Sequence, residues 1–521
     1  MNPRKYAPTL SLLSALLFMN SFAQAARPTA LIPPPVQPLE LPGSPLGIAW
    51  FILYGHLGVP AVTFLPPLRE IGGGFSKVYL FWQQIEPQKG QFDWTAPDAF
   101  VAQLQSPDEG LISLFSSSQW AVKKPSAMLP PSPAKDLKDY YDFVHATVSR
   151  YKGRVRYWQN DAEPNNPVFW AGTKEEFVAQ LKVFYRAVKD ADPAAQVVLG
   201  GYDGLFIPPN MVPLPGQRTE PFPQQKTGLE FFDYVLREGV GNFDLFDLRL
   251  YGDPYTITAR VDYMRERMRA FGPVKPIICT EYGGPGLFEF PENRAYVSLI
   301  QTWSQAATTP DSQGVPQTDK HGANRITELY AHMSTLPPQT QMFMQGCSPE
   351  LEAKYNRIQS RGVVMRNLLA LSDGVQKTLY WELLSAPGPR DDLMTLMYGK
   401  IGLVSLENGQ LKYHPTAEVF KRMAQKFDGI REVTRVPVPG QPSVFLFKVD
   451  RRARGPLYVA WERRDAFSGE DAPPITTGWP WPGAKATAID TFGAAVTATI
   501  AEGKLTLPVS VTPIYVEADS Q

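Results

Sequence analysis

Two glutamates, Glu163 and Glu281, stand where apolar stretches of the chain give way to polar or glycine-rich ones. Glu163 lies in VRYWQNDAEPNN, residues 155–166, where a short apolar run that favours a β-strand passes into a proline-containing, non-helical segment. Glu281 closes the apolar run of PIICTEYGG. Two carboxyl groups about 5 Å apart allow double displacement at a glycosidic carbon, one acting as the nucleophile and the other as acid and then base.

Each glutamate also has a plainer interpretation. The AEPN segment around Glu163 suits a solvated turn, and Glu281 taken alone suits a structural ion pair. The surrounding elements decide between these readings, because they determine whether the two carboxyl groups meet.

Strands and helices alternate along most of the chain. We expect strands at residues 46–51, 76–82, 111–115, 155–158, 196–201, 243–251, 275–281 and 376–384. We expect helices at residues 100–104, 136–151, 173–191, 228–238, 257–271, 356–371 and 415–427. About eight repeats of this alternation predict a (β/α)8 TIM barrel rather than an open sheet. Glu163 then follows the fourth strand and Glu281 ends the seventh, both at the end of the barrel where such enzymes keep their chemistry.

Two further segments depart from the alternation. Residues 283–355 are too long for an ordinary loop after the seventh strand, and we expect them to contain helices of their own. From about residue 431 the pattern changes to short alternating strands at 444–448, 457–461, 486–489, 505–507 and 513–516, which predicts an antiparallel, β-sandwich-like domain. This domain could bind carbohydrate, although a structural lid packed on the barrel is the more favoured interpretation.

The N-terminus has the pattern of a secretory signal peptide. Arg4 and Lys5 precede an apolar run at residues 10–18, and Ala23-Gln24-Ala25 offers a small-x-small cleavage site. An uncleaved membrane anchor is the alternative, but the apolar run is short for it. The expected organisation is therefore a signal peptide at 1–25, a proline-rich lead-in with little packing at 26–45, a catalytic barrel at 46–430 and a β domain at 431–521. We expect a secreted or periplasmic protein without stable membrane insertion; its oligomeric state stays open.

Composition narrows the range of partners. The chain has 51 basic and 51 acidic residues, so its charge gives no reason to expect binding to nucleic acid, and a carbohydrate substrate fits better. The five histidines show neither His-x-His nor His-Glu-x-x-His spacing, so we expect no metal site and no cofactor. Of the two cysteines, Cys279 lies in an apolar run and is expected to be a buried free thiol.

Taken in order, the motifs resemble clan A of the retaining glycoside hydrolases, and most closely family 39, which contains β-xylosidases and α-L-iduronidases. The resemblance covers nearly all of the chain from Gly47 onward. LREIGGGFSKVYLFWQQIEPQKGQFDW resembles the second-strand signature, WQNDAEPNN the acid/base strand and TEYGG the nucleophile strand. RGVVMRNLLALSDGVQKTLYWELL resembles the helix and eighth strand, and GKIGLVSLENGQLKYHPTAEVFKRM the closing segment.

The resemblance implies roles for both glutamates. Glu163 would be the acid/base, held so that its protonated form survives near neutral pH, and Glu281 the nucleophile, held ionised by hydrogen bonds. It also implies that Trp381 forms the floor under the sugar. A catalytically degenerate barrel that binds carbohydrate without cleaving it is the alternative.

The chain departs from the family pattern at three places. Ala162 stands where the family has an asparagine that binds the sugar 2-hydroxyl, and Asn160, Asp161 or Asn165 would have to replace it. On the second strand, Lys77 or Tyr79 takes the place of the arginine that supports the nucleophile. After the sixth strand, LRLYGDPY replaces His-x-Tyr, and Tyr251, more than Arg249, is expected to hold Glu281.

Tryptophans gather near the expected strand ends, and their faces could stack on pyranose rings. They are Trp82, Trp120, Trp158, Trp170 and Trp381. We expect Trp381 and Trp82 to contact substrate, together with Asn160, Asn165 and Tyr251. Core packing is the alternative for any single tryptophan.

Overall fold

The computed structural model describes residues 40–50, 65–202, 223–307, 319–385, 388–452 and 454–518. Eight parallel strands close into a barrel in sequence order, and the first strand pairs with the eighth. They are β1 (Leu46–Trp50), β2 (Phe75–Phe81), β3 (Glu109–Phe115), β4 (Tyr157–Asn160), β5 (Gln196–Tyr202), β6 (Leu245–Leu248), β7 (Ile277–Tyr282) and β8 (Thr378–Trp381). The expected barrel is confirmed.

Side chains inside the barrel form successive layers. Each strand contributes one buried residue to an apolar layer, made of Ala49, Phe75, Leu111, Tyr157, Val198, Leu245, Ile278 and Leu379. Successive strand residues point to opposite sides, so the next inward residue on each strand lies two positions further along. On five strands that residue is polar: Lys77, Ser113, Gln159, Asp247 and Thr280. The apolar layer thus seals the barrel beneath a polar one at the carboxyl ends of the strands.

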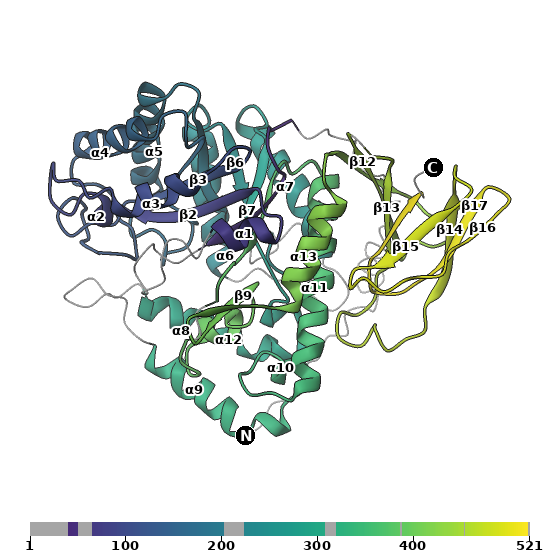
Figure 1. Cartoon of the computed structure of the whole chain (residues 1–521). Coiled ribbons are helices and arrows are strands. Elements are labelled where there is room, and N and C mark those ends of the chain that lie inside the picture. The colour runs from purple at the N-terminus through teal and green to yellow at the C-terminus, as the bar shows by residue number, and fades with distance from the viewer. Residues whose placement is uncertain are drawn as a thin grey trace, which may run out of the picture. The chain divides into compact units, whose positions relative to one another are not determined.

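Helices follow the strands and pack on the outside of the barrel. They are α1 (Leu65–Glu70), α2 (Trp82–Ile85), α3 (Thr95–Gln103), α4 (Leu137–Arg150), α5 (Lys174–Ala191), α6 (Pro223–Gly239), α7 (Ile257–Phe271), α11 (Pro349–Ser372) and α13 (Pro415–Lys426). Figure 1 shows α11 and α13 running side by side. At α5 the side chain of Thr173 accepts from the backbone of Glu176 while the Glu176 side chain accepts in return, the capping box that the sequence predicts.

The long segment after β7 carries helices, as expected. These are η3 (Leu287–Glu289), η4 (Pro291–Tyr296), α8 (Ser298–Ala307), α9 (Lys320–Ala331), η5 (Met333–Thr335) and α10 (Pro338–Gln341). They enclose an apolar cluster of their own, built around Leu287, Phe290, Phe343 and Tyr355. Between β8 and α13 lie α12 (Leu393–Tyr398) and a hairpin of β9 (Val404–Glu407) and β10 (Gln410–Tyr413).

Two antiparallel sheets form the C-terminal region, as expected. One has the order β11-β12-β13-β18-β15 and the other β14-β17-β16. Their strands are β11 (Ile430–Val436), β12 (Val444–Arg451), β13 (Leu457–Glu462), β14 (Ile475–Pro480), β15 (Ala486–Asp490), β16 (Thr499–Ala501), β17 (Lys504–Val509) and β18 (Ile514–Ala518). The sequence reading had found no strand at β11, β14 or β16. Trp461 of β13 donates a hydrogen bond to Tyr255 beside α7, which ties this region to the barrel.

Details at the N-terminal end differ from expectation. The signal peptide and most of the lead-in lie outside the described residues, but the last residues of the lead-in are well held. Gln376 accepts from the backbone of Glu40, and Lys377 donates to the carbonyl oxygens of Pro42 and Ser44. Residues 40–45 therefore pack against the start of β8. Among the described helices, none combines the length and the apolar character needed to cross a membrane.

Candidate active site

A buried hydrogen-bonded network spans the polar layer of the barrel. Ser113 donates to Gln159 (2.6 Å), and Gln159 donates to Asp247 (2.7 Å). Asp247 also accepts from the backbone and the hydroxyl group of Thr280 (2.9 and 2.6 Å), and Thr280 accepts from Lys77 (2.8 Å). Polar groups this deep stabilise a fold only when they are paired. The network therefore fixes the position of Lys77, which contacts Glu281.

Glu281, at the end of β7, lies directly above this layer and is held on both carboxylate oxygens. Lys77 donates to Oε1 (3.1 Å), Tyr79 donates to the same oxygen, and Tyr251 donates to Oε2 (3.0 Å). Burial by itself raises the pKa of Glu281, but the charges of Arg249 and Lys77 and the bond from Tyr79 outweigh it, and the pKa lies below its ordinary value. Glu281 is therefore held as a carboxylate.

Arg249 joins the two glutamates. Its Nε donates to Glu163 Oε1 (3.0 Å), and its Nη2 lies 2.9 Å from Glu281 Oε1, a contact of charges without the alignment of a hydrogen bond. Its Nη1 donates to Asp247 (2.9 Å) and to Thr280. Since one guanidinium touches both carboxylates, the strand ends of β4 and β7 do bring Glu163 and Glu281 together.

Glu163 sits on an unusual turn three residues beyond the end of β4. Asp161 and Glu163 both have positive φ, 49° and 43°, a region that residues other than glycine seldom adopt. The carbonyl oxygen of Glu163 accepts from the backbone of Asn166 (2.8 Å), which closes the turn. The turn directs the Glu163 side chain to Arg249 and leaves 11% of it exposed.

The groups that donate to Glu281 have shifted pKa values of their own. Burial and the neighbouring Arg249 lower the pKa of Lys77 to about 8, although Glu281 and Asp247 oppose this effect. Burial, together with the charge of Glu281, holds the pKa values of Tyr79 and Tyr251 well above the ordinary value. Both phenols therefore stay protonated and act as hydrogen-bond donors to Glu281.

Trp381 and Ala162 border the same site. Trp381, half-buried at the end of β8, meets the ring of Tyr79 edge-on at 6.1 Å. Ala162 is buried in a cluster with Tyr79, Phe81, Phe115 and Leu129, with Trp381 packed against it. The position next to Glu163 is thus apolar, and no polar side chain stands there.

Three other residues expected at the substrate have surroundings that do not by themselves indicate a sugar contact. Trp82 has no exposed surface and stacks on Phe143 at 4.9 Å, so the structure favours core packing for it. Asn160 is fully buried, and its amide has no hydrogen-bond partner among the described residues. Asn165 turns toward α6, where a Cβ at Gly228 would lie 3.1 Å from its Nδ2.

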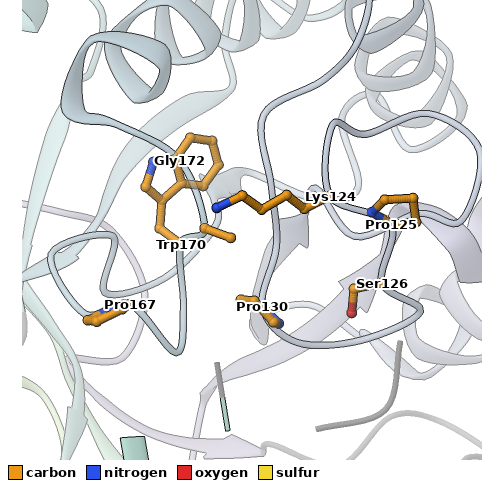
Figure 2. Close-up of a pocket in the computed structure, with 8 residues that line it drawn as sticks. Lys124, Pro125, Ser126, Pro130, Pro167, Trp170 and Gly172 are labelled. Atoms are coloured by element: carbon orange, nitrogen blue, oxygen red, sulfur yellow. The ribbon is translucent and has the colours of Figure 1, made fainter. Parts of the chain in front are cut away.

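The loops after β3 and β4 line a half-open cavity of about 280 Å³. It is lined by Lys124, Pro125, Ser126, Pro130, Pro167, Trp170, Ala171 and Gly172, and Figure 2 shows the nitrogen end of Lys124 directed toward Trp170. The loops are joined by a hydrogen bond from the backbone of Ala171 to Pro131 (2.9 Å). One wall of the cavity therefore belongs to the loop that carries Glu163.

The sequence reading missed Asp247, Thr280 and Gln159, which hold Arg249 and Lys77 in place. A signal for them exists, since each lies two positions after an apolar residue that faces the barrel interior. The sequence predicts Lys77, Tyr79 or Arg249 as supports of Glu281, and all three residues contact Glu281. Cys279 is a buried free thiol, as expected. In the part of the chain that the structure describes, no group of three or more His, Cys, Asp or Glu side chains is placed to hold a metal ion.

Comparison with known proteins gives sequence matches to part of the chain. No protein-family model matches the chain. Over 130 residues it is 28% identical to endo-1,4-beta-xylanase 3 of Hypocrea jecorina, a match that covers 23% of this chain and 36% of the xylanase. The chain thus spans about a third of the length of this curated relative.

Solved structures match over most of the chain. A family 39 glycoside hydrolase from the gut symbiont Bacteroides cellulosilyticus WH2 has a TM-score of 0.59 at 14% identity, with 91% of this chain and 81% of that chain covered. The catalytic domain of GH30 xylanase C from Talaromyces cellulolyticus has a TM-score of 0.53 at 10% identity, with 94% and 99% covered. These matches show the fold that the motifs lead us to expect: in its fold the chain is similar to glycoside hydrolases of families 39 and 30.

Proposed function

We propose that this protein is a retaining glycoside hydrolase that cleaves O-glycosidic bonds of an oligosaccharide or polysaccharide. The observation that carries the proposal is the pair of carboxylates at the ends of β4 and β7, joined by one guanidinium at the mouth of the barrel. The fold that the chain shares with glycoside hydrolases supports the proposal. The partial match to an endo-1,4-beta-xylanase makes xylan the first polymer to test as a substrate.

The contacts of each glutamate support a division of roles. Glu281 is held ionised by Lys77, Arg249 and two tyrosine hydroxyl groups, which suits attack on the anomeric carbon. Glu163 is the more exposed of the two, which suits proton transfer to the leaving oxygen and later from water. Trp381 beside Tyr79 would stack on the sugar ring. The signal-peptide pattern at residues 1–25 adds the proposal that the enzyme acts outside the cytoplasm.

The test compares Glu281→Ala and Glu163→Gln on aryl glycosides of graded leaving-group acidity. Glu281→Ala should lose turnover on every substrate, by at least about 10²-fold. Glu163→Gln should lose most on poor leaving groups and release a burst of phenol from the best one, because the glycosyl-enzyme forms but is not hydrolysed. Glu109→Gln is the matched control, since Glu109 pairs with Lys377 at the opposite end of the barrel and should leave activity unchanged. Full turnover in either active-site variant removes the assignment.

A carbohydrate-binding barrel without catalysis is the second candidate. It is favoured by Ala162, which leaves the position beside Glu163 apolar, and by the ion pair of Glu163 with Arg249, which favours the ionised form that cannot donate a proton. Incubation with a cyclophellitol-type or fluorinated glycoside separates the candidates. Covalent labelling at Glu281 supports the hydrolase, whereas sugar binding without labelling or turnover supports the binding protein.

A further inference from the structure

Asp161 is a buried carboxylate that is held by hydrogen bonds from uncharged groups. It has no exposed surface, and its side chain accepts hydrogen bonds from the backbone of Ser116 (2.7 Å), from the Ser116 hydroxyl group (3.0 Å) and from Gln180 (3.4 Å). No ion pair links Asp161 to a cation in the part of the chain that the structure describes. Such a carboxylate is costly to bury, so a compensating role is to be sought.

The backbone around Asp161 suggests that role. Asp161 itself takes the left-handed conformation, which aspartate adopts more readily than most residues, and Glu163 takes it two positions later without that advantage. The backbone of Asp161 donates to Leu114 of β3 (3.0 Å), and its side chain is anchored at Ser116, just beyond the same strand. The turn that presents Glu163 is therefore fastened to the end of β3.

Gln180 extends this anchor to a third element. While its Nε2 faces Asp161, its Oε1 accepts from the backbone of Ala134 (2.9 Å) in the loop after β3. Rotation of the Gln180 amide would place an NH₂ group against the Ala134 N–H, so Gln180 stays a donor to Asp161. Each of these partners thus donates to the Asp161 carboxyl group, and an ionised carboxylate is the form that accepts from all of them at once.

We propose that Asp161 is a positioning residue whose ionised carboxylate holds the turn that points Glu163 at the site. The inference rests on the proposed function of Glu163. It adds a pH dependence of activity that arises from the placement of the Glu163 side chain rather than from proton transfer to the substrate.

Burial raises the pKa of Asp161 to about 7, while the bonds from Ser116 and Gln180 oppose the rise. The groups that face it are Ser116 after β3, Gln180 of α5 and the phenol of Tyr140 on α4, whose pKa lies well above its ordinary value. Asp161 thus takes up its proton near neutral pH. The backbone N–H of Ser116 and the NH₂ group of Gln180 cannot accept the new O–H, so the Ser116 hydroxyl group would have to turn from donor to acceptor. The anchor weakens as the pH falls below about 7, and Glu163 is held less firmly.

The test measures kcat and KM between about pH 5 and about pH 9 for the wild type and three variants. Asp161→Asn is nearly isosteric and carries no charge at any pH in this range. It should lower kcat at high pH by roughly ten- to a hundredfold with little change in KM. It should also remove the inflection near pH 7 from the fall of kcat on the acidic side. Ser116→Ala removes only the hydroxyl donor, so it should shift this inflection to higher pH. Asp373→Asn changes another buried aspartate whose pKa is raised to about 7, at the end of α11, and should leave the kcat profile unchanged.

Circular dichroism establishes that each variant is folded, and Ser116→Ala carries the test alone if Asp161→Asn does not fold. The inference is overturned if the inflection stays in place in the folded variants, or if Asp373→Asn changes the profile as Asp161→Asn does. Loss of activity in Glu281→Ala together with wild-type behaviour of Asp161→Asn removes this inference and leaves the proposed function standing. A wild type that hydrolyses no glycoside removes both.

Discussion

Replacing Arg249 by methionine tests the electrostatic design of the site. Arg249 has no exposed surface and lies within 3.0 Å of oxygens from Glu163, Asp247 and Glu281. Breaking a buried ion pair by removing one partner costs about 3 to 5 kcal/mol, because the remaining charge is left without compensation. Arg249→Met leaves three carboxylates in that position, so a loss of about 3 to 5 kcal/mol in the free energy of unfolding at about pH 8 is the least we expect.

The pH dependence gives this prediction its sign. In the wild type the pKa of Glu281 is lowered, so its contribution to stability is present above the unfolded pKa and is lost as the pH falls through the folded value. In Arg249→Met the largest cause of that lowering is gone, so burial is opposed only by Lys77 and Tyr79 and the pKa of Glu281 is higher than in the wild type. The variant should therefore lose less stability than the wild type as the pH falls from about 8 to about 5, and the difference between the two proteins should shrink.

Urea unfolding at the two pH values measures both effects. Arg260→Met is the control, since Arg260 is buried too but donates to a backbone carbonyl oxygen, that of Tyr251. It should cost less and show no comparable pH trend. Arg249→Lys keeps the charge but, as a compact ammonium, reaches fewer of the carboxylates, so it should fall between wild type and Arg249→Met. Wild-type stability of Arg249→Met at about pH 8, or a deficit that stays constant into acid, would refute the reasoning.

Three further substitutions test residues outside this ion pair. Asp373→Asn should make the protein more stable above about pH 7: burial raises the pKa of Asp373 from 3.8 to about 7, so the wild type loses up to roughly 4 kcal/mol as the pH rises through that interval, and the neutral amide does not. Thermal unfolding across this range measures it, and parallel curves for the two proteins would contradict it. Trp381→Ala should raise KM by roughly tenfold through loss of a stacking surface, while Trp82→Phe should lower the melting temperature and leave KM unchanged. Equal effects of the two tryptophan variants on KM would argue against a substrate contact for Trp381.

The sequence predicts the barrel well because its signals are local and repeated. The helix expected at residues 257–271 has those bounds in the structure, and α5 begins at its predicted capping box. Three C-terminal strands escaped prediction for a physical reason: β11, β14 and β16 are edge strands, partly exposed, and they are held by partners rather than by an apolar pattern of their own.

For the site, the position of a residue along its strand mattered more than its type. Trp82 was expected at the substrate because it ends the expected strand at residues 76–82. Val78 and Leu80, which alternate with Lys77 and Tyr79 as Trp82 does, belong with it to the large core cluster and not to the interior layer. Lys77 has the other parity, that of Phe75 in the interior layer, and reaches Glu281. Counting two positions from the interior layer agrees with the expected place of Lys77 at Glu281, and it would also have placed Gln159, Asp247 and Thr280. Arg249 contacts both glutamates only because the closed barrel brings β4, β6 and β7 together, and the sequence alone does not predict this contact.

The balance of charge in the site bears on which carboxylate exchanges a proton. Lys77 and Arg249 supply two positive charges against the three carboxylates of Glu163, Asp247 and Glu281, so full ionisation leaves one buried negative charge in excess. Neutralising one carboxylate removes that excess. Asp247 is fully buried under donors and cations, and Glu281 is held ionised by its neighbours, with 7% of its side chain exposed. Glu163, at 11%, is the most exposed of the three, so a proton that balances the site has its readiest path there, as its proposed role of acid and base requires.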